Sequence, residues 1–388
     1  MCNSPPFDPH APFNELPPLP PARDIETKPI LKLCIEARAS LASLREAAKS
    51  IPNDSILVNS LPLLEAKDSS EIENIITTTD KLFIQARLFE ENADPATKEA
   101  LRYRTALWKG FESLRSRPLC TNTAVEVCQI IKAANIDVRT TPGTALVNDR
   151  TGVKIYTPPE GEARLRELLR NWERFIHERG DIDPLVRMAV QHYQFEAIHP
   201  FTDGNGRTGR ILNILMLADQ KLLDLPIVYP SRYIIQSKSQ YYNLLYGVTR
   251  DGAWEPWIGY MLEMVETSAN HAHARINAIK LLIDATRMLL KRHVPKIYST
   301  ELLDILFAMP YTRISDLVGH GIAQRQTAAV YLAQLADLGA VTEIKLGREK
   351  LFLNIGLLNM LKLDDDNLAD GVSRIVSDIE KLELKSPL

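Results

Sequence analysis

A run of twelve residues, His199 to Arg210 (HPFTDGNGRTGR), holds most of the side chains in this sequence that could carry out chemistry. Three of the twelve are glycines, which let a backbone approach a ligand closely. Apolar residues at helical spacing follow, so the run should lead into a helix. The unpaired N–H groups and the positive dipole end at a helix start attract anions. The run therefore predicts a binding site for phosphate groups.

Four polar side chains of this run complement such a site. Arg207 and Arg210 are three residues apart, so they lie on one helix face, and arginine can bind phosphate through two parallel hydrogen bonds. Asp203 offers the hard oxygen that Mg²⁺ prefers. His199 can accept a proton at neutral pH, because the ordinary pKa of histidine is about 6.5. Each feature alone is common in scaffolding, but together they fit the transfer of a phosphate ester.

The whole run resembles the signature of the Fic family, HPFx(D/E)GNGRxxR, at every defined position. The resemblance extends over about residues 60–270. Members of this family mostly transfer AMP from ATP to a hydroxyl group of a target protein, on an all-helical fold. The resemblance thus implies a nucleotidyltransferase, and more closely a protein adenylyltransferase, with ATP as co-substrate and Mg²⁺ as cofactor.

The resemblance also implies a role for each matched residue. His199 would be the general base that takes the proton from a Ser, Thr or Tyr hydroxyl of the target, and Asp203 would hold Mg²⁺. Arg210 would pair with the γ-phosphate of ATP. For Tyr241, as for Tyr242, a contact with the adenine or ribose stands against simple packing in the core. The residues expected to bind ATP are Gly204, Asn205, Gly206, Arg207, Thr208, Gly209, Arg210 and Tyr241.

A second motif lies upstream, where the segment SSEIEN (69–74) resembles the inhibitory pattern (S/T)xxxE(G/N) of the family. The resemblance implies that Glu73 pairs with Arg210 and takes the place of the γ-phosphate, so that the protein inhibits itself. We expect an inhibitory helix over about 68–80 that is N-capped by one of the two serines. The alternative is an ordinary capped helix with a solvated glutamate. The defined positions of the pattern are Ser69, Glu73 and Asn74.

A hairpin is predicted within residues 140–162, where β-branched residues flank a turn at 148–152. It resembles the flap of the family, along which an extended target segment can pair through its main chain. The alternative is a plain surface hairpin. The flap residues expected to dock the target are Gly152, Val153, Lys154, Ile155 and Tyr156.

Three regions follow from the patterns along the chain. Residues 1–95 hold a proline-rich arm and N-terminal helices that include the inhibitory helix. Residues 96–270 hold the catalytic core. Residues 271–388 hold a linker helix, a winged-helix-like domain and a tail. We therefore expect a mainly α fold, with a Fic-type helical bundle, a β-hairpin flap and a C-terminal winged-helix-like α+β unit. Apolar spacing predicts separate helices over 254–268 and 273–293.

Composition limits the functions further. The 388 residues carry a formal net charge of -3, which excludes a strongly basic nucleic-acid binder. DNA binding by the C-terminal unit is left open but is not favoured over a protein contact. No apolar run reaches the ~20 residues of a membrane span, and the N-terminus lacks the pattern of a secretory signal. The four cysteines have no CxxC spacing, which indicates reduced thiols in a cytoplasmic protein and no zinc site.

Other functions could use the same residues. The site could remove AMP from a modified target by hydrolysis, with Glu73 orienting a water molecule. The chain could be a DNA-binding regulator whose Fic unit only senses a nucleotide, or a transferase that uses another nucleotide donor. Self-modification and a homodimer are both compatible with the sequence.

Overall fold

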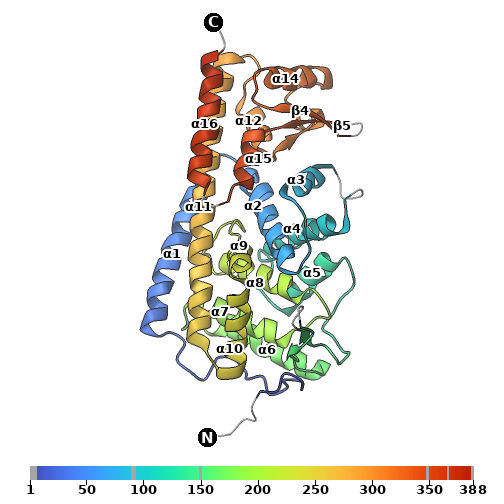
Figure 1. Ribbon diagram of the computed structural model, residues 1–388, viewed down its shortest axis with the longest axis vertical. Coiled ribbons are helices and arrows are strands. Elements are labelled where there is room, and N and C mark those ends of the chain that lie inside the picture. Colours follow the sequence, from blue (N-terminus) through green and yellow to red (C-terminus); the bar gives the residue numbers. More distant parts are fainter. Residues whose placement is uncertain (1–6, 89–92, 148–150, 347–348, 365–366, 386–388) are drawn as a thin grey trace.

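The structure is a mainly helical assembly built around one long helix, α11 (Trp254–His293) (Figure 1). Helix α1 (Lys28–Lys49) packs along one part of α11, and α16 (Leu368–Lys385) packs along another. No helix among the described residues is long and apolar enough to cross a membrane. The computed structural model describes residues 7–88, 93–147, 151–346, 349–364 and 367–385.

Helix α11 runs without a break through residues 269–272, so the prediction of two separate helices there is wrong. Ala269 and Ala272 are fully buried and continue the apolar face. Alanine is the best helix former and fits a close contact between helices. The helix prediction followed the spacing of large apolar side chains, so it did not register these two alanines as part of the apolar face. The expected boundary near residue 270 therefore lies inside one continuous helix.

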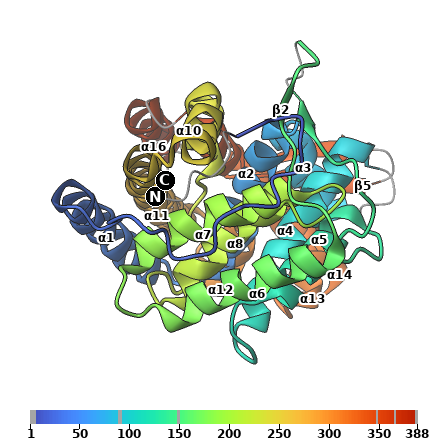
Figure 2. The same ribbon diagram turned by 90° about the horizontal axis from the view of Figure 1, so that it is seen from below.

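Two buried helices, α7 (Pro184–Ile198) and α8 (Asn205–Asp219), lie at the centre of the helical bundle (Figure 2). Nearly all of their residues are buried, because other helices cover them on several sides. Two of their buried polar side chains, Gln191 of α7 and Asn213 of α8, are hydrogen-bonded to each other inside the bundle. The other helices of this bundle are α4 (Pro95–Ser113), α5 (Thr121–Lys132), α6 (Glu162–Glu178), α9 (Ser231–Gln236) and α10 (Lys238–Asp251).

Helix α2 (Ser55–Ile72) differs from its prediction. The expected inhibitory helix over about 68–80, N-capped by Ser69 or Ser70, is wrong, since both serines are buried inside the last turns of α2. Residues 73–78 are not helical, and α3 (Thr79–Leu88) begins after them. The buried face of α2 continues to the end of the helix and includes both serines. They therefore lie inside this helix and do not cap the start of another.

The C-terminal unit contains a small antiparallel sheet of order β3-β5-β4. Strands β4 (Thr342–Leu346) and β5 (Glu349–Leu353) form the longer pair of this sheet, and residues 347–348 between them lie outside the described residues. The unit shares one hydrophobic core with the rest of the chain, and its first helix packs against α2. Its other elements are α12 (Thr300–Ala308), β3 (Tyr311–Thr312), α13 (Ile314–Gly319), α14 (Arg325–Asp337) and α15 (Ile355–Lys362).

The proline-rich arm lies extended along the surface and crosses α7 toward β2 (Lys154–Tyr156) (Figure 2). Proline cannot donate a backbone hydrogen bond, so side chains and neighbouring segments hold the arm. The Phe13 N–H donates to the Thr157 carbonyl at 3.0 Å, and Leu16 and Leu19 are buried. The described thiols Cys34, Cys120 and Cys128 are free.

Candidate active site

The run from His199 to Arg210 forms the turn between α7 and α8 and the first turns of α8. Gly204, the N-cap of α8, has φ 87°, a left-handed value that favours glycine. Asn205 accepts a hydrogen bond from the Phe201 N–H and donates one to the Phe201 carbonyl, both at 2.8 Å. Phe201 is fully buried. Asn205, expected at the phosphates, therefore uses its amide to fix the loop.

The glycines of α8 face two different sides. At Gly206, an added Cβ would lie 2.6 Å from Oε1 of Glu73 and 3.0 Å from Nη1 of Arg210, so this glycine faces the Arg210 side of the site. At Gly209, an added Cβ would overlap the carboxyl of Glu196 on α7, so this glycine permits the close contact between the two helices. Thr208 is also buried. The ATP contacts predicted for Thr208 and Gly209 stay predictions, and packing explains both residues.

His199 ends α7 in a left-handed conformation with φ 50°. Burial and the nearby Arg139 guanidinium lower its pKa to about 4, while the Glu73 and Asp203 carboxylates act in the opposite direction. The imidazole is therefore uncharged at neutral pH. It has the protonation state that a general base needs.

Arg139, which the sequence did not single out, holds this turn in place. Its Nε donates to the His199 carbonyl at 2.8 Å, and its backbone N–H donates to the Pro200 carbonyl at 2.8 Å. The residue is 4% exposed and lies in an irregular segment between α5 and the hairpin. A lone arginine in such a segment carries no sequence signal, so only the tertiary contacts reveal it.

Glu73 and Arg210 form the ion pair that the resemblance implies. Nη2 of Arg210 donates to Oε1 of Glu73 at 2.9 Å, and its Nε donates to Oγ of Ser69 at 2.8 Å. Only 2% of the Arg210 side chain is exposed, against 34% for Glu73. Burial raises the pKa of Glu73, but Arg210, with Arg207 and Lys238, outweighs burial and lowers that pKa overall, so the carboxylate is charged at neutral pH. The end of α2 thus binds Nε and Nη2 of this guanidinium.

Asn74 explains the last position of the inhibitory pattern. Its φ is 61°, a left-handed value that asparagine and glycine adopt more readily than other residues. The Asn74 N–H donates to the Glu71 carbonyl, and the Ile75 N–H donates to the Ser70 carbonyl, both at 3.0 Å. These two bonds form a Schellman motif. The helix therefore stops directly at Glu73 and turns its carboxylate toward Arg210.

Asp203 and Arg207 belong to a second charged cluster. The Lys132 ammonium bonds to one oxygen of Asp203, and Nη2 of Arg207 lies 3.5 Å from the other. Arg207 is almost fully buried and pairs with Glu99 of α4. It thus has acidic partners before any phosphate arrives. The sequence did not predict Lys132 or Glu99.

The surroundings of Asp203 fit a Mg²⁺ ion that is bound mainly by a nucleotide. Its side chain is 60% exposed, so one carboxylate faces solvent beside the start of α8. Mg²⁺ commonly takes one or two carboxylates and completes its shell with water and phosphate oxygens. Asp203 would have to exchange its contact with Lys132 for such an ion.

Tyr241 lies in an aromatic cluster beneath the site. Its hydroxyl and Nε2 of His192 are 2.8 Å apart, and its ring packs near Trp257 and Tyr260. Only 2% of Tyr241 is exposed. These contacts match the core alternative, and its predicted contact with ATP stays a prediction. Tyr242, in contrast, is 43% exposed.

The predicted hairpin is present as β1 (Leu146–Val147) paired antiparallel with β2. Val153 and Ile155 are exposed, while Tyr156 is buried and its hydroxyl donates to the Ala197 carbonyl at 2.8 Å. Tyr156 therefore ties the base of the hairpin to α7, two residues before His199. The expected turn residues 148–150 lie outside the described residues.

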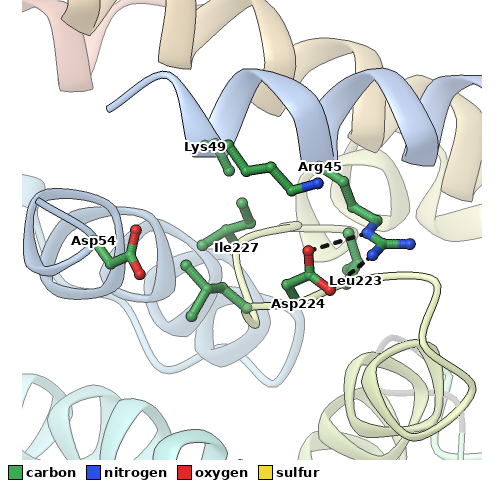
Figure 3. A pocket seen from close by; sticks show the side chains of 8 residues that line it. Arg45, Lys49, Asp54, Leu223, Asp224 and Ile227 are labelled. Atoms are coloured by element: carbon green, nitrogen blue, oxygen red, sulfur yellow. Dashed lines mark hydrogen bonds and ion pairs between the residues drawn. The ribbon is translucent and has the colours of Figure 1, made fainter. Parts of the chain in front are cut away.

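A separate hollow of 240 Å³ lies between α1 and the segment after α8 (Figure 3). Arg45 and Asp224 form an ion pair there at 2.9 Å, and Lys49 pairs with Glu46 on its own helix. These charges satisfy one another, and no residue of the two motifs lines the hollow. The start of α8 therefore stays the candidate site.

Two known protein adenylyltransferases are similar in sequence to part of this chain. Protein adenylyltransferase fic-1 of Caenorhabditis elegans is 36% identical over 88 residues, which are 22% of this chain and 16% of that protein. Protein adenylyltransferase Fic of Drosophila melanogaster is 31% identical over 112 residues, which are 28% of this chain and 21% of that protein. The matched segments thus span about a fifth of each relative.

The fold is also similar to a solved structure, a Fic family protein from Desulfovibrio desulfuricans G20. The TM-score is 0.53 at 18% identity, over 86% of this chain and 98% of that one. Three family models match in succession. The Fic/DOC family N-terminal model matches residues 31–112, the Fic/DOC family model matches 123–217, and the model of the C-terminal domain of SoFic-like protein adenylyltransferases matches 282–357. By these matches the chain carries, in this order, a Fic/DOC N-terminal domain, a Fic domain and a SoFic-like C-terminal domain.

Proposed function

We propose that this protein transfers AMP from ATP to a hydroxyl side chain of a target protein and that Glu73 holds it in an inhibited state. One observation carries the proposal. An uncharged His199 lies beside the start of α8, within electrostatic range of Glu73, and the Glu73 carboxylate is paired with the Arg210 guanidinium. A base and an arginine beside a helix N-terminus suit phosphate chemistry.

In the proposed reaction, the target hydroxyl oxygen attacks the α-phosphorus of ATP. The bond from that phosphorus to the oxygen bridging the α- and β-phosphates breaks, and pyrophosphate leaves. The hydroxyl proton passes to His199, which is neutral because its pKa is about 4. A Mg²⁺ ion held by Asp203 would neutralise charge on the phosphates. Arg210 and the N–H groups at the start of α8 would hold the phosphate oxygens.

Inhibition follows from the occupied arginine. The γ-phosphate and the Glu73 carboxylate are both anions, so they compete for one buried guanidinium and repel each other. ATP that binds without this contact would place its α-phosphate poorly for attack. Because phosphoryl transfer depends on position, a small displacement is costly.

We further propose that the hairpin positions the target. Its exposed Val153 and Ile155 offer apolar contacts beside an open strand edge. The Tyr156 bond to the Ala197 carbonyl supports this role, because it links the strand to the helix that ends at His199.

For the C-terminal unit, whose order of helices and strands suits a winged helix, we propose a contact role rather than DNA binding. Two observations support this role: α12 packs against α2, and Lys362 of α15 pairs with Asp80 of α3 at 2.7 Å. A gel shift with DNA fragments tests the alternative.

The test is incubation of cell lysate with ATP labelled at the α-phosphate, followed by identification of the adduct by mass. Replacing Glu73 by glycine frees Arg210, so Glu73→Gly should raise AMP transfer at least about tenfold, the effect of about 1.4 kcal/mol. His199→Ala in the Glu73→Gly background should lower it about 10²–10⁴-fold. Glu71→Gln is the matched control, since it removes a neighbouring carboxylate of α2 that pairs with Lys67 instead.

The proposal is wrong if Glu73→Gly transfers no more label than the wild-type protein. Release of AMP from a modified target that is fed to the wild-type protein would favour the hydrolase alternative instead.

A further inference from the structure

The C-terminal end of α2 carries Glu73, so the contacts that fix this helix end also fix the proposed inhibition. The last four carbonyl groups of an α-helix have no partner inside the helix. At the end of α2, all four are satisfied. The acceptors and donors are Ser69 O with Arg210 Nη2, Ser70 O with Ile75 N, Glu71 O with Asn74 N, and Ile72 O with Lys238 Nζ.

Two of these donors are cations from other helices. The last turn of α2 has no basic residue of its own, although a helix C-terminus favours positive charge. Arg210 of α8 and Lys238 of α10 provide that charge. The Lys238 ammonium lies 2.6 Å from the Ile72 carbonyl, in a half-buried contact across 166 residues of sequence. Arg210 belongs to the signature, but Lys238 belongs to neither motif.

Lys238 is poorly placed for its own helix. It is the first residue of α10, whose first turn has no acidic side chain. A cation at a helix start is unfavourable, because the dipole is positive there. The favourable partner of this lysine is thus the end of α2. Its charge also lowers the pKa of Glu73, which keeps that carboxylate ionised for Arg210.

We propose that Lys238 is a positioning residue of the inhibited state, whose ammonium holds the Ile72 carbonyl and so places Glu73 against Arg210. The inference rests on the proposed function. Lys238 acts through Glu73, so its effect must disappear when Glu73 is absent.

The first test measures AMP transfer with labelled ATP and lysate for Lys238→Met, Lys238→Arg, Glu73→Gly and the double variant. Lys238→Met should raise transfer about three- to tenfold, since a charge-assisted hydrogen bond is lost. Lys238→Arg should stay near the wild-type rate, because arginine can donate to the same carbonyl. In the Glu73→Gly background, Lys238→Met should change nothing.

Two results would overturn the proposal. Lys238→Met could transfer AMP at the wild-type rate. It could also lower transfer in the Glu73→Gly background, which would mean that Lys238 contacts the bound nucleotide instead.

A second test needs no activity. Hydrogen exchange without ATP should be faster at the Asn74 and Ile75 amides in Lys238→Met, because the helix end opens more often. Lys280→Met, which removes an exposed lysine from α11, is the matched control and should leave these amides unchanged. If Glu73→Gly transfers no AMP, the proposed function is wrong, but the exchange rates of the Asn74 and Ile75 amides still test the role of Lys238. Equal exchange rates in Lys238→Met and Lys280→Met would refute that role.

Discussion

Two helix ends meet at the site, the N-terminal end of α8 and the C-terminal end of α2, and they are held in different ways. The start of α8 has uncharged contacts within its own loop, namely the Asn205 bonds to Phe201 and the left-handed Gly204, and Arg139 supports the turn before it. The end of α2 combines a local Schellman motif with charged partners far away in sequence, such as Arg210. The first end has an affinity for anions and the second for cations.

This difference separates the proposed catalysis from its proposed control. A loop that is fixed by hydrogen bonds within the loop can keep its shape when ATP binds. A preorganised phosphate site requires such a loop. A helix end held by an ion pair can be released by any anion that competes for the same arginine. We therefore expect changes at α8 to affect folding and catalysis, and changes at the end of α2 to affect mainly the fraction of active molecules.

The largest effect is expected at the contact between α7 and α8. In Gly209→Ala, the new methyl group overlaps the Glu196 carboxyl and crowds His192 and Phe195. Overpacking of this kind costs about 1–3 kcal/mol, so the free energy of unfolding in urea should fall by that amount. Gly180→Ala is the control, because no atom lies within 4 Å of its added Cβ. Equal stability of both variants would contradict the described packing.

The next effect concerns the pH dependence of the base. Burial and Arg139 lower the pKa of His199 to about 4, so the imidazole should stay neutral well below its usual range. In Glu73→Gly, kcat at saturating ATP should be flat from about pH 8 to 5 and fall about tenfold per pH unit below 4, because protonation removes the base. Circular dichroism at each pH checks that the protein is folded. An inflection near pH 6.5 would disprove a buried base.

The smallest effect is expected at the turn that ends α2. Asn74→Ala places a methyl-bearing residue at φ 61°, which costs about 1 kcal/mol, so transfer should rise about fivefold as the inhibited state weakens. Asn74→Gly should keep the inhibition, because glycine adopts this conformation freely. The pair of variants separates the backbone effect from loss of the side chain. A similar rise in both would point to the side chain.

Much of the site could be predicted from sequence because its parts are close together in the chain. His199, Asp203 and Arg210 lie within twelve residues, and the order of loop and helix places them around one helix start. The inhibitory pattern was also readable, since Ser69 and Glu73 are one helical turn apart and both contact Arg210. The error in the bounds of α2 arose because serine is a common N-cap residue, whereas Ser69 and Ser70 lie inside the last turns of this helix.

The sequence alone predicted phosphate-type chemistry with His199 as the base, and the family resemblance predicted the pairing of Glu73 with Arg210, which the structure contains. The tertiary structure decided what supports them: Arg139 behind His199, Lys132 beside Asp203, and the carbonyl contact of Lys238. It also decided that α11 is one helix. The physical reason is that local spacing records which face of an element is apolar, whereas a hydrogen bond across more than 150 residues, as from Lys238 to Ile72, leaves no periodic pattern to read.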